Sequence, residues 1–217
     1  MRRDLAALEE KKKIVRSHGG ASKVSTARTC LPINFRKTVH HAEKRKLCAA
    51  AAKLCRDKDV IFVDASTSAQ QISEFLESKR DVTVVTNSIP LAIRLKEKGI
   101  CSYTTGGEIK EDAMCFIGSF AEEFIRKFNF DIMFFSCKGV SEKGDIVDVS
   151  LPENNLRRCA MQRAEKSVFI CDSSKLFQSA PFCLSPLSEI DYIITDDTDA
   201  PARLPSVPRE KFILITE

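Results

Sequence analysis

Val60-Ile61-Phe62-Val63-Asp64-Ala65-Ser66-Thr67-Ser68 joins a run of four apolar residues directly to a polar loop. A short continuous apolar run is typical of a strand buried on both faces, as strands in parallel sheets are. The segment that follows, 68–76, has the pattern of a helix. A buried strand that passes through a hydroxyl-rich loop into a helix predicts the repeating unit of an α/β domain.

The same pattern continues on both sides of this stretch. Further helices are expected over 40–56, 90–98, 120–127 and 152–166. Further strands are expected over 82–85, 100–104, 132–135, 168–171, 192–194 and 212–215. Strands that alternate with helices predict an α/β fold with a mostly parallel sheet flanked by helices.

The N-terminal residues follow a different pattern. Arg2 to Lys12 are expected to form a short helix, and Ile14 to Ala21, which include the pair Gly19-Gly20, a strand and a tight turn. The segment 22–38 has no clear period and contains a proline, which indicates a linker.

The basic residues are concentrated at the N-terminal end. Residues 1–58 carry 16 Lys and Arg against 5 Asp and Glu, whereas residues 59–217 carry 18 against 25. A basic arm on a mildly acidic body suggests a polyanionic partner such as nucleic acid. A solvated basic surface is the alternative that charge alone leaves open.

The composition excludes several classes of protein. Of the 217 residues, 43% are hydrophobic and 29% are charged, which is ordinary for a globular protein and argues against wholesale disorder. The chain has no apolar run of about 18 residues and no signal-peptide core, so we expect no membrane span and a cytoplasmic location. Nine cysteines without CxxC spacing indicate buried free thiols in a reducing compartment, rather than disulfides or a metal site.

Small polar residues follow four of the expected strands, in the loops 64–68, 86–88, 105–108 and 171–175. Parallel sheets bind ligands at the carboxyl ends of their strands, and backbone amides, hydroxyls and an ammonium group suit a small anion. Each loop alone could be an ordinary helix cap or turn. Together the loops predict one pocket, in which a common cavity is surrounded by Ser66, Asn87, Gly106 and Lys175.

The sequence contains little that indicates catalysis. Its three histidines, His18, His40 and His41, lie in the basic arm, so neither a histidine-based triad nor a zinc site is supported. No catalytic residue, metal or cofactor is assigned, and the sequence contains neither GxGxxG nor a P-loop motif. A loop with Lys138, Glu142, Asp145 and Asp148, close in sequence to Glu153, could perform acid–base chemistry, but a hydrophilic surface loop is the preferred interpretation.

Several short motifs resemble those of the DeoR-type bacterial transcription regulators, from residue 2 to about residue 197. They are Arg2-Arg3-Asp4-Leu5 with Leu8-Glu9, His18-Gly19-Gly20-Ala21, Asp64 with Thr67, Thr86-Asn87-Ser88, Gly106-Gly107 and Asp172-Ser173-Ser174-Lys175. Each motif is weak alone, whereas their order and spacing together are specific.

The resemblance implies three segments: part of a winged helix-turn-helix at 1–24, a linker at 25–39 and an effector-sensing α/β domain at 40–217. The family's sensor domain is similar in fold to ribose-phosphate isomerases and CoA transferases, and it binds a phosphorylated sugar that controls DNA binding. The chain is therefore expected to be a homo-oligomeric repressor of sugar metabolism, with DNA and a phosphorylated sugar as its partners.

The same reasoning assigns two sets of binding residues. The residues expected to bind the effector are Asp64, Ser66, Thr67, Ser68, Thr86, Asn87, Ser88, Gly106, Gly107, Lys138, Glu153, Arg157 and Lys175. The residues expected to contact DNA are Arg2, Arg3, Arg16, His18 and Lys23.

The chain departs from the family pattern in several places. Arg2 to Glu10 match the recognition helix without the helices that precede it, which predicts weak DNA binding by this chain or a start further upstream. Ser66 replaces a Gly, and Arg157 replaces a Lys that pairs with a preceding Glu. Ser136-Cys137-Lys138-Gly139-Val140 replaces Gly-Ala-Asp/Asn-Gly-Ile, and this exchange is expected to alter the sugar specificity.

Two other functions stay open from the sequence. The chain could be an isomerase or deaminase that acts on a sugar phosphate, in which case neutralising Glu153 or Asp145 would abolish turnover. It could also be a sensor domain that has lost DNA binding and acts through a partner or through oligomerisation. The basic arm, with its recognition-helix and wing residues, favours the regulator.

Overall fold

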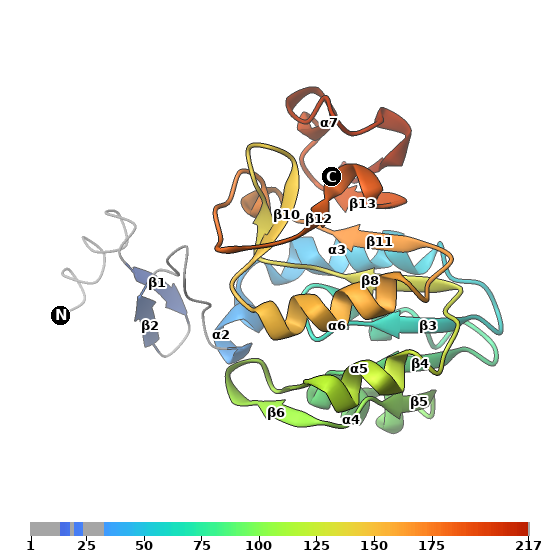
Figure 1. The fold of residues 1–217 in the computed structure, drawn as a ribbon. Coiled ribbons are helices and arrows are strands. Elements are labelled where there is room, and N and C mark those ends of the chain that lie inside the picture. The colour runs from blue at the N-terminus through green and yellow to red at the C-terminus, as the bar shows by residue number, and fades with distance from the viewer. Residues whose placement is uncertain (1–13, 18–19, 24–32, 217) are drawn as a thin grey trace.

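A seven-stranded sheet in which every pairing is parallel forms the centre of the protein (Figure 1). The computed structural model describes residues 14–17, 20–23 and 33–216. The strand order is β14-β13-β11-β8-β3-β4-β5. In chain order these strands are β3 (Val60–Val63), β4 (Thr83–Thr86), β5 (Cys101–Thr104), β8 (Ile132–Phe135), β11 (Ser167–Ile170), β13 (Tyr192–Thr195) and β14 (Phe212–Leu214). The predicted α/β class is therefore confirmed.

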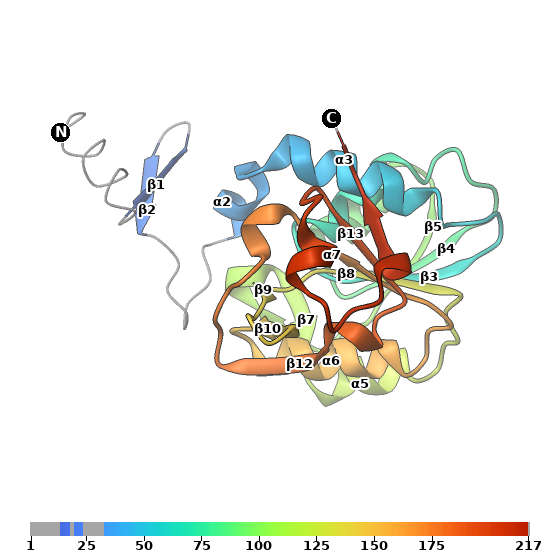
Figure 2. The same ribbon diagram turned by 90° about the horizontal axis from the view of Figure 1, so that it is seen from above.

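Helices cover both faces of this sheet (Figure 2). Because side chains alternate along a strand, Ile61 and Val63 of β3 pack into the layer of α3 (His41–Ala52) and α4 (Ile89–Glu97), whereas Phe62 packs into the layer of α5 (Ser119–Ile125) and α6 (Leu151–Met161). The two hydrophobic cores bury large aliphatic and aromatic side chains completely, and this burial is the main source of stability. The short helix α7 spans Ala200–Arg203.

Several elements differ from the sequence prediction. The segment 68–76 forms a 3-10 helix, η1 (Ala69–Glu74), in place of an α-helix. The helix predicted to reach residue 166 ends at Met161, because the chain after it pairs with the segment before β8: the backbone N–H of Phe130 donates to Arg163 and that of Glu165 donates to Phe130. The remaining 3-10 helices are η2 (Glu111–Ala113), η3 (Ser173–Lys175), η4 (Leu187–Glu189) and η5 (Arg209–Lys211).

Two small antiparallel sheets were not predicted. One is a hairpin of β6 (Glu108–Lys110) and β7 (Cys115–Ile117). The other contains β9 (Gly139–Val140), β10 (Asp145–Asp148) and β12 (Phe182–Pro186) in the order β12-β10-β9. The acidic segment 138–148 is therefore a β-hairpin whose last residue, Asp148, is buried, and the interpretation as a hydrophilic surface loop is wrong at that residue.

The strand predicted from Ile14 is confirmed, whereas the tight turn predicted at Gly19-Gly20 lies partly outside the described residues. β1 (Ile14–Ser17) and β2 (Gly20–Lys23) form an antiparallel hairpin in which Ser17 opposes Gly20. The helix predicted from Arg2 to Lys12 lies outside the described residues. Within the segment expected to be a linker, the structure has a helix, α2 (Ile33–Thr38), and it buries Ile33 and Phe35. No helix in the described part of the chain is long and apolar enough to cross a membrane.

Candidate anion-binding pocket

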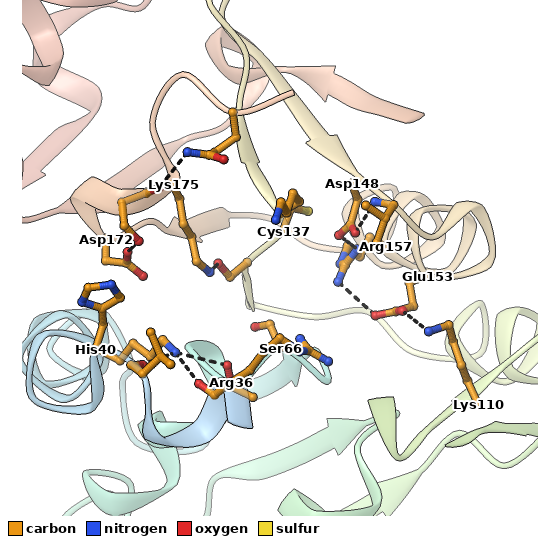
Figure 3. Close-up of a pocket in the computed structure, with 18 residues that line it drawn as sticks. Arg36, His40, Ser66, Lys110, Cys137, Asp148, Glu153, Arg157, Asp172 and Lys175 are labelled. Carbon is orange, nitrogen blue, oxygen red and sulfur yellow. Dashed lines mark hydrogen bonds and ion pairs between the residues drawn. The ribbon is translucent and has the colours of Figure 1, made fainter. Parts of the chain in front are cut away.

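A cavity of about 180 Å³ lies beyond the carboxyl ends of β3, β8 and β11 (Figure 3). The turn between α2 and α3, the β6 strand and the first turns of α6 complete its walls. The lining residues are Arg36, Val39, His40, Lys44, Ser66, Thr67, Lys110, Ser136, Cys137, Lys138, Asp148, Val149, Glu153, Arg157, Asp172, Ser174, Lys175 and Gln178. Six of them are Lys or Arg and three are Asp or Glu, so the lining carries an excess of positive charge.

The structure brings together eight of the thirteen residues expected to bind the effector. The six that line the cavity are Ser66, Thr67, Lys138, Glu153, Arg157 and Lys175. Asp64 and Ser68 contact lining residues directly, Asp64 through Arg157 and Ser68 through Lys175. These eight residues come from four separate segments, so only the tertiary fold makes them neighbours.

The five residues from the two outer loops do not line this cavity: Thr86, Asn87, Ser88, Gly106 and Gly107. Their groups serve local structure. Ser88 accepts a hydrogen bond from the N–H of Leu91 as the N-cap of α4, and Asn87 donates to the carbonyl of Phe116. Gly107 has a positive φ of 110° and no room for a Cβ against Ile117. Of the four residues expected around one cavity, Ser66 and Lys175 line it, whereas Asn87 and Gly106 do not.

Arg157 organises one side of the pocket. Its side chain is 4% exposed, and its guanidinium donates to Asp64 Oδ2 at 2.9 Å, to Asp148 Oδ2 at 2.7 Å and to Glu153 Oε2 at 3.4 Å. Burial alone would lower the pKa of Arg157, but the acidic groups around it raise that pKa well above the ordinary value. A buried guanidinium shared among carboxylates holds their oxygens in fixed positions.

Glu153 and Lys110 on this side are held in place by contacts with α6 and with each other. Ser150, the N-cap of α6, accepts from the N–H of Glu153, and Lys110 of β6 pairs with Glu153 Oε1 at 3.4 Å. Burial raises the pKa of Asp64, while Arg157 and Ser66 oppose that shift. The Asp148 and Glu153 carboxylates therefore present acceptors to the cavity, which suits the hydroxyl groups of a polar ligand.

Lys175 organises the other side. Its ammonium donates to Ser68 Oγ at 3.0 Å and to Ser136 Oγ at 2.6 Å, which ties the β11 loop to the loops after β3 and β8. Burial acts to raise the pKa of Asp172, but Lys175 and the hydrogen bond from Ser174 lower it by more, so the net shift of that pKa is downward. Figure 3 shows Lys175, Asp172 and His40 across the cavity from Arg157, Glu153 and Lys110.

Sequence reasoning missed the residues that the α2–α3 turn contributes. Lys44 is 4% exposed although it lies in a helix rich in charged residues, where a lysine is ordinarily solvated. Its position three residues before the buried Leu47 places both side chains on the inner face of α3. That spacing was the one available signal for a buried lysine.

The described residues hold no group of three or more His, Cys, Asp or Glu side chains that could bind a metal ion. The eight cysteines among them are free thiols, six of them buried, as the sequence indicated. Cys137 lines the cavity, and burial raises the pKa of its thiol well above the ordinary value, so it is protonated at neutral pH.

A parallel α/β sheet with a charged cavity at its carboxyl edge is typical of proteins that bind small polar ligands. Residues 39–197 match the family model of the DeoR C terminal sensor domain, and residues 1–27 match that of the DeoR-like helix-turn-helix domain. The chain therefore belongs to the DeoR family of transcriptional regulators, as its motifs indicated.

Relatives of known name extend along most of the chain. An uncharacterised HTH-type transcriptional regulator, YulB of Bacillus subtilis, is 30% identical over 97% of this chain and 82% of its own length. The HTH-type transcriptional repressor GlcR of the same organism is 34% identical over 90% of this chain and 75% of its own. The lactose phosphotransferase system repressor of Staphylococcus epidermidis is 28% identical over 92% of this chain and 80% of its own length.

Among solved structures, the chain is similar to ribose 5-phosphate isomerase A of Methanocaldococcus jannaschii, with a TM-score of 0.48 and 17% identity. The match covers 63% of this chain and 55% of that chain, so the chain spans about half the length of this structure.

Proposed function

We propose that this protein is a transcriptional repressor of sugar metabolism whose DNA binding is controlled by a phosphorylated sugar in the pocket described above. The observation that carries the proposal is the composition of one cavity. Ammonium groups and hydroxyls lie on one side, and carboxylates fixed by Arg157 lie on the other. The cationic side suits a phosphate, and the carboxylate acceptors suit sugar hydroxyls.

Support for the regulatory part comes from family membership and from the names of the relatives, which include GlcR and the lactose phosphotransferase system repressor. In the proposal, the segment 1–27 contacts the operator, with Arg2, Arg3, Arg16, His18 and Lys23 as the contacting residues. Effector binding changes operator affinity through different affinities for two arrangements of the protein, a coupling that is typically about 1–3 kcal/mol.

The test is a thermal-shift screen of the purified protein with a panel of pentose and hexose phosphates, each paired with the same sugar lacking its phosphate. A ligand at about 100 times its dissociation constant stabilises by roughly 2.7 kcal/mol, which is a readily measured increase in Tm. We expect phosphorylated members to stabilise and their unphosphorylated partners to have no effect. Equal responses to both members of every pair, or turnover of the sugar phosphates, would contradict the proposal.

Lys175 allows a sharper version of this test. Lys175→Met removes the ammonium that bridges Ser68 and Ser136 but keeps most of the aliphatic stem. We expect it to abolish the thermal shift caused by the sugar phosphate. The matched control is Lys166→Met, since Lys166 precedes β11 at the end opposite to the cavity and is half-buried, as Lys175 is.

A further inference from the structure

The turn between α2 and α3 is itself a wall of the cavity. Arg36, Val39, His40 and Lys44 all line it. His40 has left-handed backbone angles, φ 52° and ψ 40°, and stands at the N-cap of α3 without a side-chain cap. A non-glycine residue in this region is energetically unfavourable unless its surroundings hold it there. The turn therefore depends on contacts made by neighbouring groups.

Lys44 supplies those contacts. Its ammonium donates to the carbonyl oxygens of Arg36 and Val39, at 2.7 Å each, and approaches Thr67 Oγ1 at 3.4 Å. The first two bonds join the end of α2 to the start of α3. The third reaches the β3 loop, at the cationic side of the cavity. One buried ammonium thus connects the turn to the ligand-binding loop.

The acceptors that hold Lys44 are neutral oxygens, so its positive charge is not cancelled by direct ion pairing in these contacts. Four charged groups influence it electrostatically. Lys175 and Arg36 repel the ammonium, whereas Asp172 and Glu43 attract it. Two ammonium groups, Lys44 and Lys175, therefore act on each other beside the same cavity, and an anion between them would relieve their repulsion.

We propose that the Lys44 ammonium binds the anionic group of the effector and that this contact weakens its hydrogen bonds to the carbonyl oxygens of Arg36 and Val39. An ammonium has three donors, and the acceptor that it holds least closely is Thr67 Oγ1 at 3.4 Å. A ligand oxygen replaces that contact, and its negative charge draws the ammonium away from the two carbonyl oxygens. Occupancy of the cavity thereby changes the conformation of the α2–α3 turn. The inference rests on the proposed function, because it requires an anionic ligand in this cavity.

The place of the turn in the chain gives this change a consequence. α2 begins six residues after the segment that matches the helix-turn-helix model, and it is the first helix of the described residues. A change at the end of α2 therefore acts on the element that leads directly to the DNA-binding segment. In this proposal Lys44 contacts the ligand and also couples occupancy of the cavity to the conformation of α2, the helix nearest to the DNA-binding segment in sequence.

Hydrogen–deuterium exchange of the full chain tests the proposal. The amides of residues 36–44 are followed with and without ribose 5-phosphate, glucose 6-phosphate, fructose 1-phosphate and inorganic phosphate. Wild type, Lys44→Met, Lys44→Arg and the control Lys46→Met are compared, because Lys46 is exposed on the same helix. In wild type and in Lys46→Met, we expect a binding phosphate compound to speed exchange in this segment.

The Lys44 variants separate the two roles of the residue. In Lys44→Met, exchange of residues 36–44 should already be fast without ligand, a phosphate compound should not change it, and the Kd should rise at least tenfold. Lys44→Arg keeps the charge but cannot reproduce the three contacts of the ammonium, so it should bind measurably but with a higher Kd than wild type. Circular dichroism and a cooperative thermal transition establish that each variant is folded, and Lys44→Arg serves alone if Lys44→Met does not fold.

Two negative results have different meanings. If the wild type binds one of the phosphate compounds, and Lys44→Met or Lys44→Arg binds it with the same Kd and the same exchange pattern, the inference about Lys44 is wrong and the proposed function stands. If the wild type binds no phosphorylated sugar and no inorganic phosphate, the proposed function fails and this inference fails with it.

Discussion

Two buried cations with different partners set the chemistry of the pocket. Arg157 is held by three carboxylates and is fully compensated, whereas Lys44 is held by neutral oxygens. A compensated buried ion is a structural component, because removing it leaves its partners charged and unpaired. A buried ion held by neutral groups keeps its charge available for a ligand, and its pKa is lowered to about 8, first by burial and then by Lys175.

Replacing Arg157 should destabilise the protein severely. Arg157→Met leaves the buried carboxylates of Asp64 and Asp148 without a counter-ion, and breaking such a cluster typically costs about 3–5 kcal/mol. Urea unfolding measures the loss. Arg157→Lys keeps the charge but not the planar guanidinium, so it should recover part of the lost stability. The control is Arg209→Met at an exposed site, which should change the free energy of unfolding by less than about 0.5 kcal/mol.

Lys44 should make stability increase with pH in the alkaline range. Its pKa is about 8 in the folded chain and close to 10.5 when unfolded, so between these values the unfolded chain binds more protons. The free energy of unfolding should therefore gain at most roughly 1.4 kcal/mol per pH unit from this group. Urea unfolding at pH 7.5 and pH 9.5 checks this as a difference between wild type and Lys44→Met, because the buried cysteines, whose pKa values burial raises, lower the stability of both chains over the same range. Lys44→Met should remove the gain, whereas Lys46→Met should keep it.

At the scale of elements, helix caps and ligand loops look alike in sequence. The loops 64–68 and 86–88 both follow a buried strand, contain hydroxyls and open a helix. Only the first lines the cavity, because β3 lies beside β8 in the sheet, while β4 lies one strand further out. The Ser88 hydroxyl of the second loop is used by the N–H of Leu91 at 3.2 Å.

Ser88→Ala should therefore affect stability and not ligand binding. Loss of an N-cap hydroxyl typically costs about 1 kcal/mol of the free energy of unfolding. The dissociation constant of the sugar phosphate, measured by isothermal titration calorimetry, should be unchanged. A variant in the inner loop, Thr67→Val, is the counterpart and should weaken binding. If Ser88→Ala weakens binding as much as Thr67→Val does, the outer loop belongs to the site after all.

At the scale of the whole molecule, the charge is divided unevenly between two parts of the chain. Residues 1–58 are strongly basic, and the remainder is mildly acidic. The basic part contains the segment that matches the helix-turn-helix model and also α2 and Lys44. In the proposed function, one region of the chain therefore meets the DNA phosphates at one end and the effector phosphate at the other.

Binding to an operator selected from random DNA should weaken steeply as salt increases. Neutralised phosphates release counter-ions, so the logarithm of the affinity falls linearly with the logarithm of salt concentration, at a slope of about −0.9 per phosphate contact. Fluorescence anisotropy at several salt concentrations measures the slope. Arg16→Gln and Lys23→Gln should each reduce it by about one. An affinity independent of salt would argue against the assigned DNA contacts.

The sequence by itself determined the α/β class, the family and the order of the main strands and helices, because buried parallel strands and amphipathic helices differ in local periodicity. It also identified six of the lining residues. Ser66, Thr67 and Lys175 were found because polar loops at strand ends are visible as local composition, and Lys138, Glu153 and Arg157 were found through the family resemblance. The small sheets were missed because β9 has only two residues and β10, with an Asp at each end, lacks the continuous apolar run of the central strands.

Only the tertiary structure decided which loops share the cavity and which charges are paired. Arg157 meets Asp64 across 93 residues of sequence, and Lys175 meets Ser68 across 107. No local pattern encodes such contacts, because they follow from strand order in the sheet. Lys44 is the clearest case. Its helix is rich in charged residues, so the sequence predicts an exposed lysine, but the side chain is buried because the α2–α3 turn folds over it. Burial and neighbouring charge are properties of the folded chain alone.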